Sequence, residues 1–152
     1  MDIKIDYLCG KWMHNAGKVA QWVYDAHYKS KKTHTFDQVL ASVKICYAGY
    51  LPIRLVATIG EECIGTISIV KEDIAGKSYT PWITLLYVDG EDNVLEVSKM
   101  LITRSKEVLK TLGHKEIYVK DAKGKLYKTL GWQYVEKCKD GKQKVKIFKT
   151  QI

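Results

Sequence analysis

The spacing of apolar residues divides the chain into segments of two kinds. Apolar residues at every second position, or in a short continuous run, predict strands, because strand side chains alternate between two faces. Gly60 lies at the end of one such segment and Gly141 between two others, and each predicts a tight hairpin turn. The predicted strands cover residues 3–8, 54–60, 63–73, 82–88, 115–120, 133–139 and 142–149.

Apolar residues at helical spacing predict four helices between these strands. They cover residues 17–29, 36–50, 94–113 and 124–131. Thr35 is a typical N-cap for the second helix, and Gly113 ends the third. The resulting order, β–α–α–β–β–β–α–β–α–β–β, contains no repeat and no linker. It predicts a single α/β domain spanning residues 1–152, built around a mixed sheet.

Composition and charge narrow the class of protein. The chain has 152 residues, of which 46% are hydrophobic and 28% charged, as in a globular domain. No apolar run approaches the ~20 residues of a membrane span, and the N-terminus lacks the apolar core of a signal peptide. We therefore expect a cytoplasmic protein without a membrane partner. The net charge of +8 comes almost entirely from scattered lysines, with only Arg54 and Arg104, so we expect a solvated surface and no nucleic-acid groove.

The cysteines indicate a reducing environment. Cys9, Cys46, Cys63 and Cys138 lie far apart and form no Cys-x-x-Cys pair. Such spacing favours four reduced thiols over a disulfide framework or a zinc site. The chain also shows no Ser-His-Asp or metal-ligand pattern, and we expect no metal.

Three stretches, in this order, resemble the GNAT superfamily of N-acetyltransferases. "LVATIGEECIGTISIVKEDI" is similar to the family's second and third strands, with Gly65 entering the latter. "TPWITLLYVDGED" resembles the fourth strand of a bacterial subgroup, and "YVKDAKGKLYKTLGW" resembles the fifth strand and the helix after it. The resemblance covers essentially the whole chain. It implies an α+β fold with a central, mostly antiparallel mixed sheet of about seven strands and about four flanking helices.

The resemblance also implies an activity, the transfer of an acetyl group from acetyl-CoA to a primary amine of a small molecule or protein. In the family the fourth and fifth strands splay apart and pantetheine pairs with the open edge of the fourth, here Leu86, Tyr87 and Val88. A backbone N–H of that strand polarises the thioester carbonyl, and the amine attacks directly. Tyr127 occupies the family's tyrosine position, where a phenol can protonate the departing thiolate; the alternative is that its ring only packs under the sheet.

A general base would have to take the proton from the amine. Glu72 and Asp73 end the third strand, near the place where acceptors enter in this family; the alternative is that both are solvated hairpin carboxylates. His14, His27, His34 and His114 share no motif, and we expect them to be surface or helix-face residues. The acceptor itself is not specified by the sequence, and both a monomer and a homodimer remain open.

The loop after the fourth strand departs from the family pattern, in which bare glycines and a helix N-terminus hold the pyrophosphate of CoA. The corresponding positions here are Asn93, Val94, Leu95, Glu96, Val97 and Ser98. Asn93 and Glu96 suggest a capping box, which would occupy the helix end with the chain's own side chains. Two hypotheses follow: an acetyltransferase in which Lys123, Lys125 and Lys128 replace the glycine loop as phosphate ligands, or an inactive relative that binds its partner in the same cleft.

Overall fold

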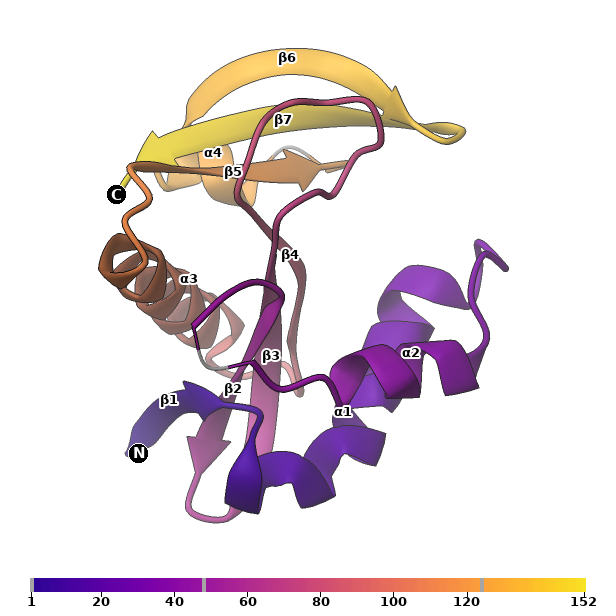
Figure 1. The fold of residues 1–152 in the computed structure, drawn as a ribbon, viewed down its shortest axis with the longest axis vertical. Coiled ribbons are helices and arrows are strands. Elements are labelled where there is room, and N and C mark those ends of the chain that lie inside the picture. Colours follow the sequence, from indigo (N-terminus) through magenta and orange to yellow (C-terminus); the bar gives the residue numbers. More distant parts are fainter. Residues whose placement is uncertain (1, 48, 124) are drawn as a thin grey trace.

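One mixed sheet of seven strands organises the molecule in the computed structural model, which describes residues 2–47, 49–123 and 125–152 (Figure 1). The strand order is β1-β2-β3-β4-β5-β7-β6, and every neighbouring pair is antiparallel except β4 and β5. The fold class expected from the sequence is confirmed. The strands are β1 (Ile3–Tyr7), β2 (Ile53–Ile59), β3 (Glu62–Val70), β4 (Trp82–Val88), β5 (Glu116–Asp121), β6 (Gln133–Asp140) and β7 (Gln143–Gln151).

The helices differ from the predicted ones mainly near the N-terminus. The first helical region contains a 3₁₀ turn, an α-helix and a π-helix in succession, in place of one helix over 17–29. The elements are η1 (Gly10–Asn15), α1 (Ala16–Val23), η2 (Tyr24–Tyr28), α2 (Phe36–Val43), α3 (Val94–Thr111) and α4 (Leu126–Thr129). The predicted helices 36–50 and 124–131 include Ala48 and Gly124, which lie outside the described residues. No helix in the described ranges is long and apolar enough to cross a membrane.

The helix α2 begins as predicted but ends earlier. Thr35 caps it in a full capping box: the Gln38 N–H donates to the Thr35 hydroxyl at 3.2 Å, and the Thr35 N–H donates to the Gln38 side chain at 2.9 Å. Val43 is the last residue of the helix, and Ile45 is 40% exposed, so the apolar stripe does not continue beyond it. The predicted extension to residue 50 is therefore wrong.

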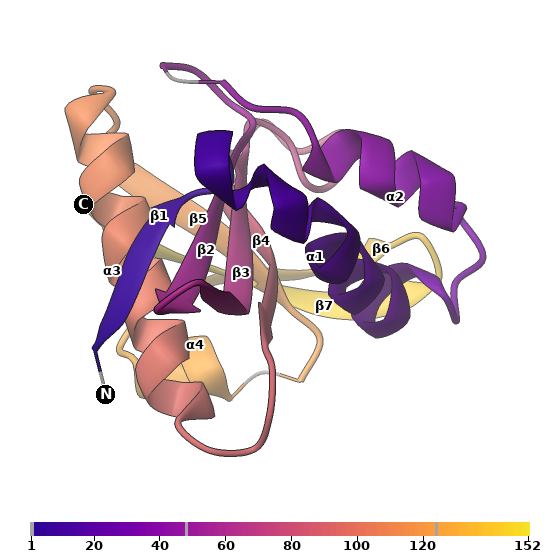
Figure 2. The same cartoon turned by 90° about the horizontal axis from the view of Figure 1, so that it is seen from below.

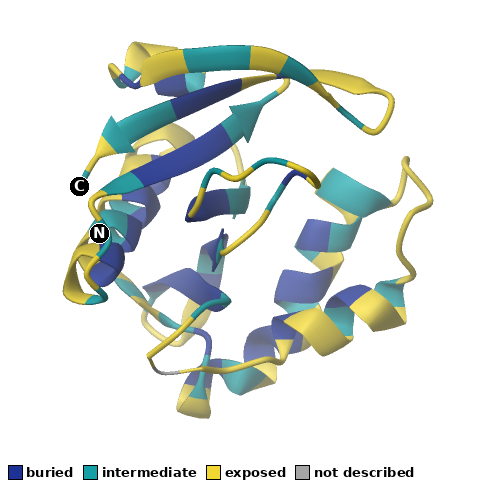
Figure 3. Ribbon diagram, turned by 45° about the horizontal axis from the view of Figure 1, so that its top comes forward, coloured by how far each residue is buried: buried dark blue, intermediate teal, exposed yellow. Residues whose placement is uncertain are grey.

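Helices cover both faces of the sheet, with α3 on one side and α1 and α2 on the other (Figures 1 and 2). The α3 face contains the largest buried cluster, which includes Leu55, Ile67 and Leu101. A second cluster, which includes Val19, Val39 and Val56, fills the space between the sheet and α1 and α2. The buried residues follow the central strands and the inward faces of the helices (Figure 3).

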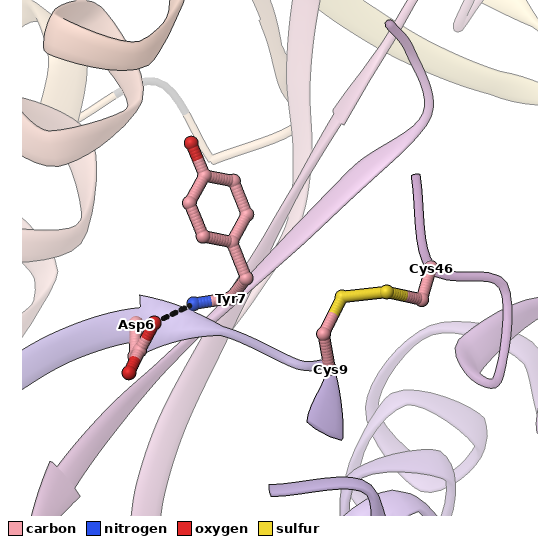
Figure 4. Close-up of a disulfide and its surroundings, with 4 residues drawn as sticks. All are labelled: Asp6, Tyr7, Cys9 and Cys46. Carbon is pink, nitrogen blue, oxygen red and sulfur yellow. Dashed lines mark hydrogen bonds between the residues drawn. A yellow bond between two sulfur atoms is a disulfide. The ribbon is translucent and has the colours of Figure 1, made fainter. Parts of the chain in front are cut away.

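A disulfide joins Cys9, which precedes η1, to Cys46, which follows α2 (Figure 4). The expectation of four reduced thiols is wrong for this pair. The two cysteines are 37 residues apart in sequence, but the packing of α1 against α2 returns the chain to the start of η1. Cys63, which is buried, and Cys138 are free.

The N-terminus of α3 is not capped in the predicted way. Asn93 has a left-handed backbone, with φ 62° and ψ 17°, and its side chain makes no capping hydrogen bond. An N-cap residue normally has an extended backbone that directs its side chain to the N–H groups of the first turn. The capping box of Asn93 and Glu96 is therefore wrong, and so is the inference that it closes this helix end. Glu96 is exposed.

The disulfide predicts the number of thiols that react after denaturation without reductant. We expect two per chain, from Cys63 and Cys138, and four after reduction. A thiol titration in denaturant, with and without prior reduction, measures both values. Four reactive thiols without reductant would contradict the disulfide.

The left-handed backbone at Asn93 predicts an unusual order of stabilities among variants of this residue. Asn93→Gly should keep or raise the free energy of unfolding, by up to about 1 kcal/mol, because glycine adopts positive φ without a steric cost. Asn93→Ser should lower it by about 1 kcal/mol, because serine has that cost and gains no cap. Denaturant melts of the three proteins measure the difference. A serine variant as stable as the wild type would restore the capping role.

Candidate active site

The sheet opens between its two parallel strands, β4 and β5. They pair at Trp82 and Tyr118, where the Tyr118 N–H donates to the Pro81 carbonyl at 2.9 Å. No further pair of residues is in register between the two strands in the described part of the chain. The later part of β4 therefore has β3 on one side and an open edge on the other.

A bulge in β4 accompanies this separation. Thr66 of β3 faces Tyr87 and Ser68 faces Thr84, so Ile67 alone spans the two residues Leu85 and Leu86. Leu85 has φ +54°, a left-handed conformation that is rare for a residue with a branched side chain. An extra residue of this kind bends a strand and redirects its hydrogen-bonding groups.

A cleft of about 770 Å³ lies at the open edge. Its wall is formed by residues of the strands β4, β5 and β7 and of the helices η2 and α4. The loop after η2, the loop after β3 and the β5–α4 loop also contribute residues. Five of the residues predicted from the sequence line it: Asp73, Leu86, Lys123, Lys125 and Tyr127.

The other predicted residues lie elsewhere. Glu72 and Lys128 are exposed and lie outside the cleft wall, and Tyr87 also lies outside it. Tyr87, which is half-buried, packs on Trp22 with 5.5 Å between ring centroids. A separate cavity of about 170 Å³ beside the β4–α3 loop is lined by Val88, Asn93 and Val97. Val94, Leu95, Glu96 and Ser98 belong to the first turns of α3 and line neither space; Ser98 is buried.

The Tyr127 ring packs under the sheet and also borders the cleft. Its ring is buried in the main cluster and packs edge-on against Trp132, with 5.0 Å between centroids. It also lines the cleft. Burial raises the pKa of its phenol well above the ordinary value, and the charge of Asp121 adds to this effect. The group is therefore a protonated phenol at neutral pH, which is the form that can donate a proton.

Asp73 is the one of the two candidate carboxylates that reaches the cleft. Its side chain is 12% exposed and lies 3.4 Å from the Lys120 ammonium, which also binds Asp140 at 2.6 Å. Burial raises the pKa of Asp73, while the charge of Lys120 opposes this shift. Lys120, on β5, thus links the loop after β3 to the end of β6 at one wall of the cleft.

His27 is a cleft residue that the sequence analysis did not select. It lies in the π-helix η2, where the Lys29 N–H donates to the Tyr24 carbonyl five residues earlier, at 2.8 Å. Burial is the largest cause of its lowered pKa, and the Leu86 backbone opposes this effect. The spacing of the histidines in the sequence does not indicate that His27 lies at the cleft, since its position depends on the path of η2 over the sheet. Short π-helical segments occur frequently at functional sites, and η2 lies beside the cleft in this way.

The described residues offer no metal site, since no group of three or more His, Cys, Asp or Glu side chains is placed to hold an ion. The strand edge and the rim of the cleft have a different chemistry. The open strand edge offers backbone hydrogen bonds to an extended chain, and exposed Lys123 and Lys125 at the rim are suited to phosphate.

No protein-family model matches the chain, and no curated relative matches it. Solved structures match over nearly its full length. An aminoglycoside 6'-N-acetyltransferase complexed with coenzyme A superimposes with a TM-score of 0.74 at 11% identity, over 97% of this chain and 96% of the other. The corresponding enzyme from Enterococcus faecium gives 0.71 at 12%, over 99% and 97%. YncA from Salmonella typhimurium, solved with its cofactor acetyl-CoA, gives 0.70 at 16%, over 99% and 94%. The chain therefore has the fold of the GNAT acetyltransferases.

Proposed function

We propose that the protein is an acetyl-CoA-dependent N-acetyltransferase that acts on a primary amine. The observation that carries the proposal is the open edge of β4 beside a cleft that also contains Tyr127. Two of the matched structures were solved with CoA or acetyl-CoA, and this supports the proposal.

The donor would lie along β4, with its pantetheine paired to the backbone of Leu86, Tyr87 and Val88. A backbone N–H of this edge would stabilise the negative charge that gathers on the thioester oxygen as the amine attacks. Lys123 and Lys125 line the cleft and would bind phosphate groups of the donor, and Lys128 lies on α4 outside the cleft wall. Lysine supplies a strong point charge for this purpose.

Tyr127 would donate its phenolic proton to the thiolate that leaves. Asp73 would hold the acceptor amine as its ammonium, since its side chain is nearly buried in the wall of the same cleft. Glu72, exposed and outside that wall, is the weaker of the two carboxylate candidates.

The alternative function, an inactive relative with a closed donor site, depended mainly on the capping box at α3. Since Asn93 makes no such cap, the N–H groups of the first turn are not occupied by that side chain. The alternative loses its main support.

Calorimetric titration with acetyl-CoA, followed by a thiol-release assay with a panel of amines, tests the function. The panel contains kanamycin, because two of the matched structures are aminoglycoside acetyltransferases, together with spermidine, a lysine-containing tetrapeptide and glycine. We expect saturable donor binding and amine-dependent release of CoA. No heat of binding at millimolar acetyl-CoA would exclude the proposal.

Tyr127→Phe should lower kcat by roughly 10- to 100-fold, within the range of general acid catalysis, while the Kd for acetyl-CoA changes little. The hydroxyl acts only as the thiolate leaves, so donor binding does not depend on it. Tyr134→Phe is the matched control, because Tyr134 is 50% exposed on β6 and outside the cleft wall. An unaltered kcat in Tyr127→Phe would remove Tyr127 from the mechanism.

A further inference from the structure

Two buried polar atoms in the cleft residues lack a hydrogen-bond partner. Within the described ranges they are Nε2 of His27 and Oδ2 of Asp73, and they are the only buried side-chain nitrogen or oxygen atoms there without one. Both residues line the 770 Å³ cleft. An unsatisfied buried polar group costs free energy comparable to a lost hydrogen bond, so each such group needs a specific explanation, and a catalytic role is one.

The two atoms complement a primary amine. A carboxylate oxygen accepts an N–H bond, and a neutral imidazole nitrogen accepts a second one. An amine nitrogen carries the N–H groups that either atom would accept. A carboxylic acid or a phosphate would instead repel Asp73, so the pair selects a basic nitrogen.

His27 is also beside the part of β4 where acyl transfer would occur. It lines the same cleft as Leu86, the first residue after the bulge position at Leu85. An amine bound at His27 would therefore lie in the cleft that the open strand edge borders.

The groups around His27 keep its imidazole neutral. Lys31 follows η2, Arg54 lies on β2 and Lys120 on β5, and each of these positive charges lowers the pKa of His27 in addition to burial. Arg54 is itself buried, and Tyr28 lies in its electrostatic field. Asp73 and Asp121 are acidic groups of the cleft wall, and Lys120 binds Asp73 at 3.4 Å. A neutral imidazole has the lone pair that a base requires.

We propose that His27 is the general base of the transfer, with Nε2 accepting a proton from the acceptor amine, and that Asp73, in the wall of the same cleft, helps to hold this amine. This inference rests on the acetyltransferase function proposed above. An acceptor that arrives as an ammonium first loses one proton to water. As its nitrogen forms the bond to the acetyl carbon, Nε2 takes the second proton. The carbon–sulfur bond breaks, Tyr127 protonates the thiolate, and solvent carries the imidazolium proton back to the phenolate, so atoms and charge balance.

The test compares His27→Gln with His114→Gln, a control in the loop between α3 and β5 and outside the cleft wall. The substrate is the panel amine that the wild type acetylates fastest. We expect His27→Gln to lose about 100-fold or more in kcat/KM, with an acetyl-CoA Kd within twofold of wild type, and His114→Gln to match the wild type. Wild-type kcat/KM should fall more steeply with decreasing pH below the pKa of His27, because protonation removes the base. That pKa, read from the ring signals by NMR, should lie below 6.5.

Each result has one meaning. If the kcat/KM of His27→Gln equals that of the wild type, His27 is not the base. The same conclusion follows if the change of slope in the pH profile does not coincide with the NMR titration of His27. Either result leaves the acetyltransferase function intact. A wild type that binds acetyl-CoA but acetylates no panel amine would overturn both for this panel. Because the pH profile and the NMR titration use wild-type protein, the test stands even if His27→Gln does not fold.

Discussion

The extra residue in β4 is the constraint from which the candidate site follows. Parallel strands that remained paired along their length would leave no edge and no cleft, but β4 and β5 are paired only at Trp82 and Tyr118. After the bulge, β4 stays attached to β3, where Gly65 faces Val88. A Cβ on Gly65 would lie 3.1 Å from the Tyr87 carbonyl and close to Val97 and Leu101, so this glycine lets β4 and α3 approach β3 closely. One side of β4 is thus held tightly while the other is free.

The charges of the cleft are concentrated at the same place. Burying Lys120 and Asp73 is costly unless each is compensated, and Lys120 meets this requirement by binding both Asp73 and Asp140. Oδ2 of Asp73 and Nε2 of His27 remain without a hydrogen-bond partner. A domain selected for stability alone would satisfy such atoms internally or replace them with apolar groups. The two residues line the 770 Å³ cleft, and a ligand there explains these atoms more easily than folding does.

Regular features of this fold could be predicted from sequence, and features that depend on spatial neighbours could not. Period-two runs located the strands, and Thr35 with Gln38 forms the cap expected at α2. The Cys9–Cys46 bond was missed because cysteine spacing does not reveal which residues meet in space. Asn93 was misassigned because a capping motif is defined by residue types, whereas a cap also needs an extended backbone, which Asn93 lacks. Asp73 could be chosen from its position after a strand; His27 could not, since its place in the cleft depends on a π-turn.

The β4–α3 loop and the first turn of α3 carry several acidic residues near the place where the donor's phosphates would lie. Asp89, Glu91, Asp92 and Glu96 are all exposed, so water and salt screen their repulsion of a phosphate, at roughly 1 kcal/mol for each close contact in high dielectric. Backbone pairing along β4 is not screened in this way, and Lys123 and Lys125 at the cleft offer attraction of similar size. Recognition of a donor would then depend mainly on the strand edge and its acyl-bearing arm. The nucleotide end, held by a balance of opposed surface charges, would contribute less and would be the part most sensitive to ionic strength.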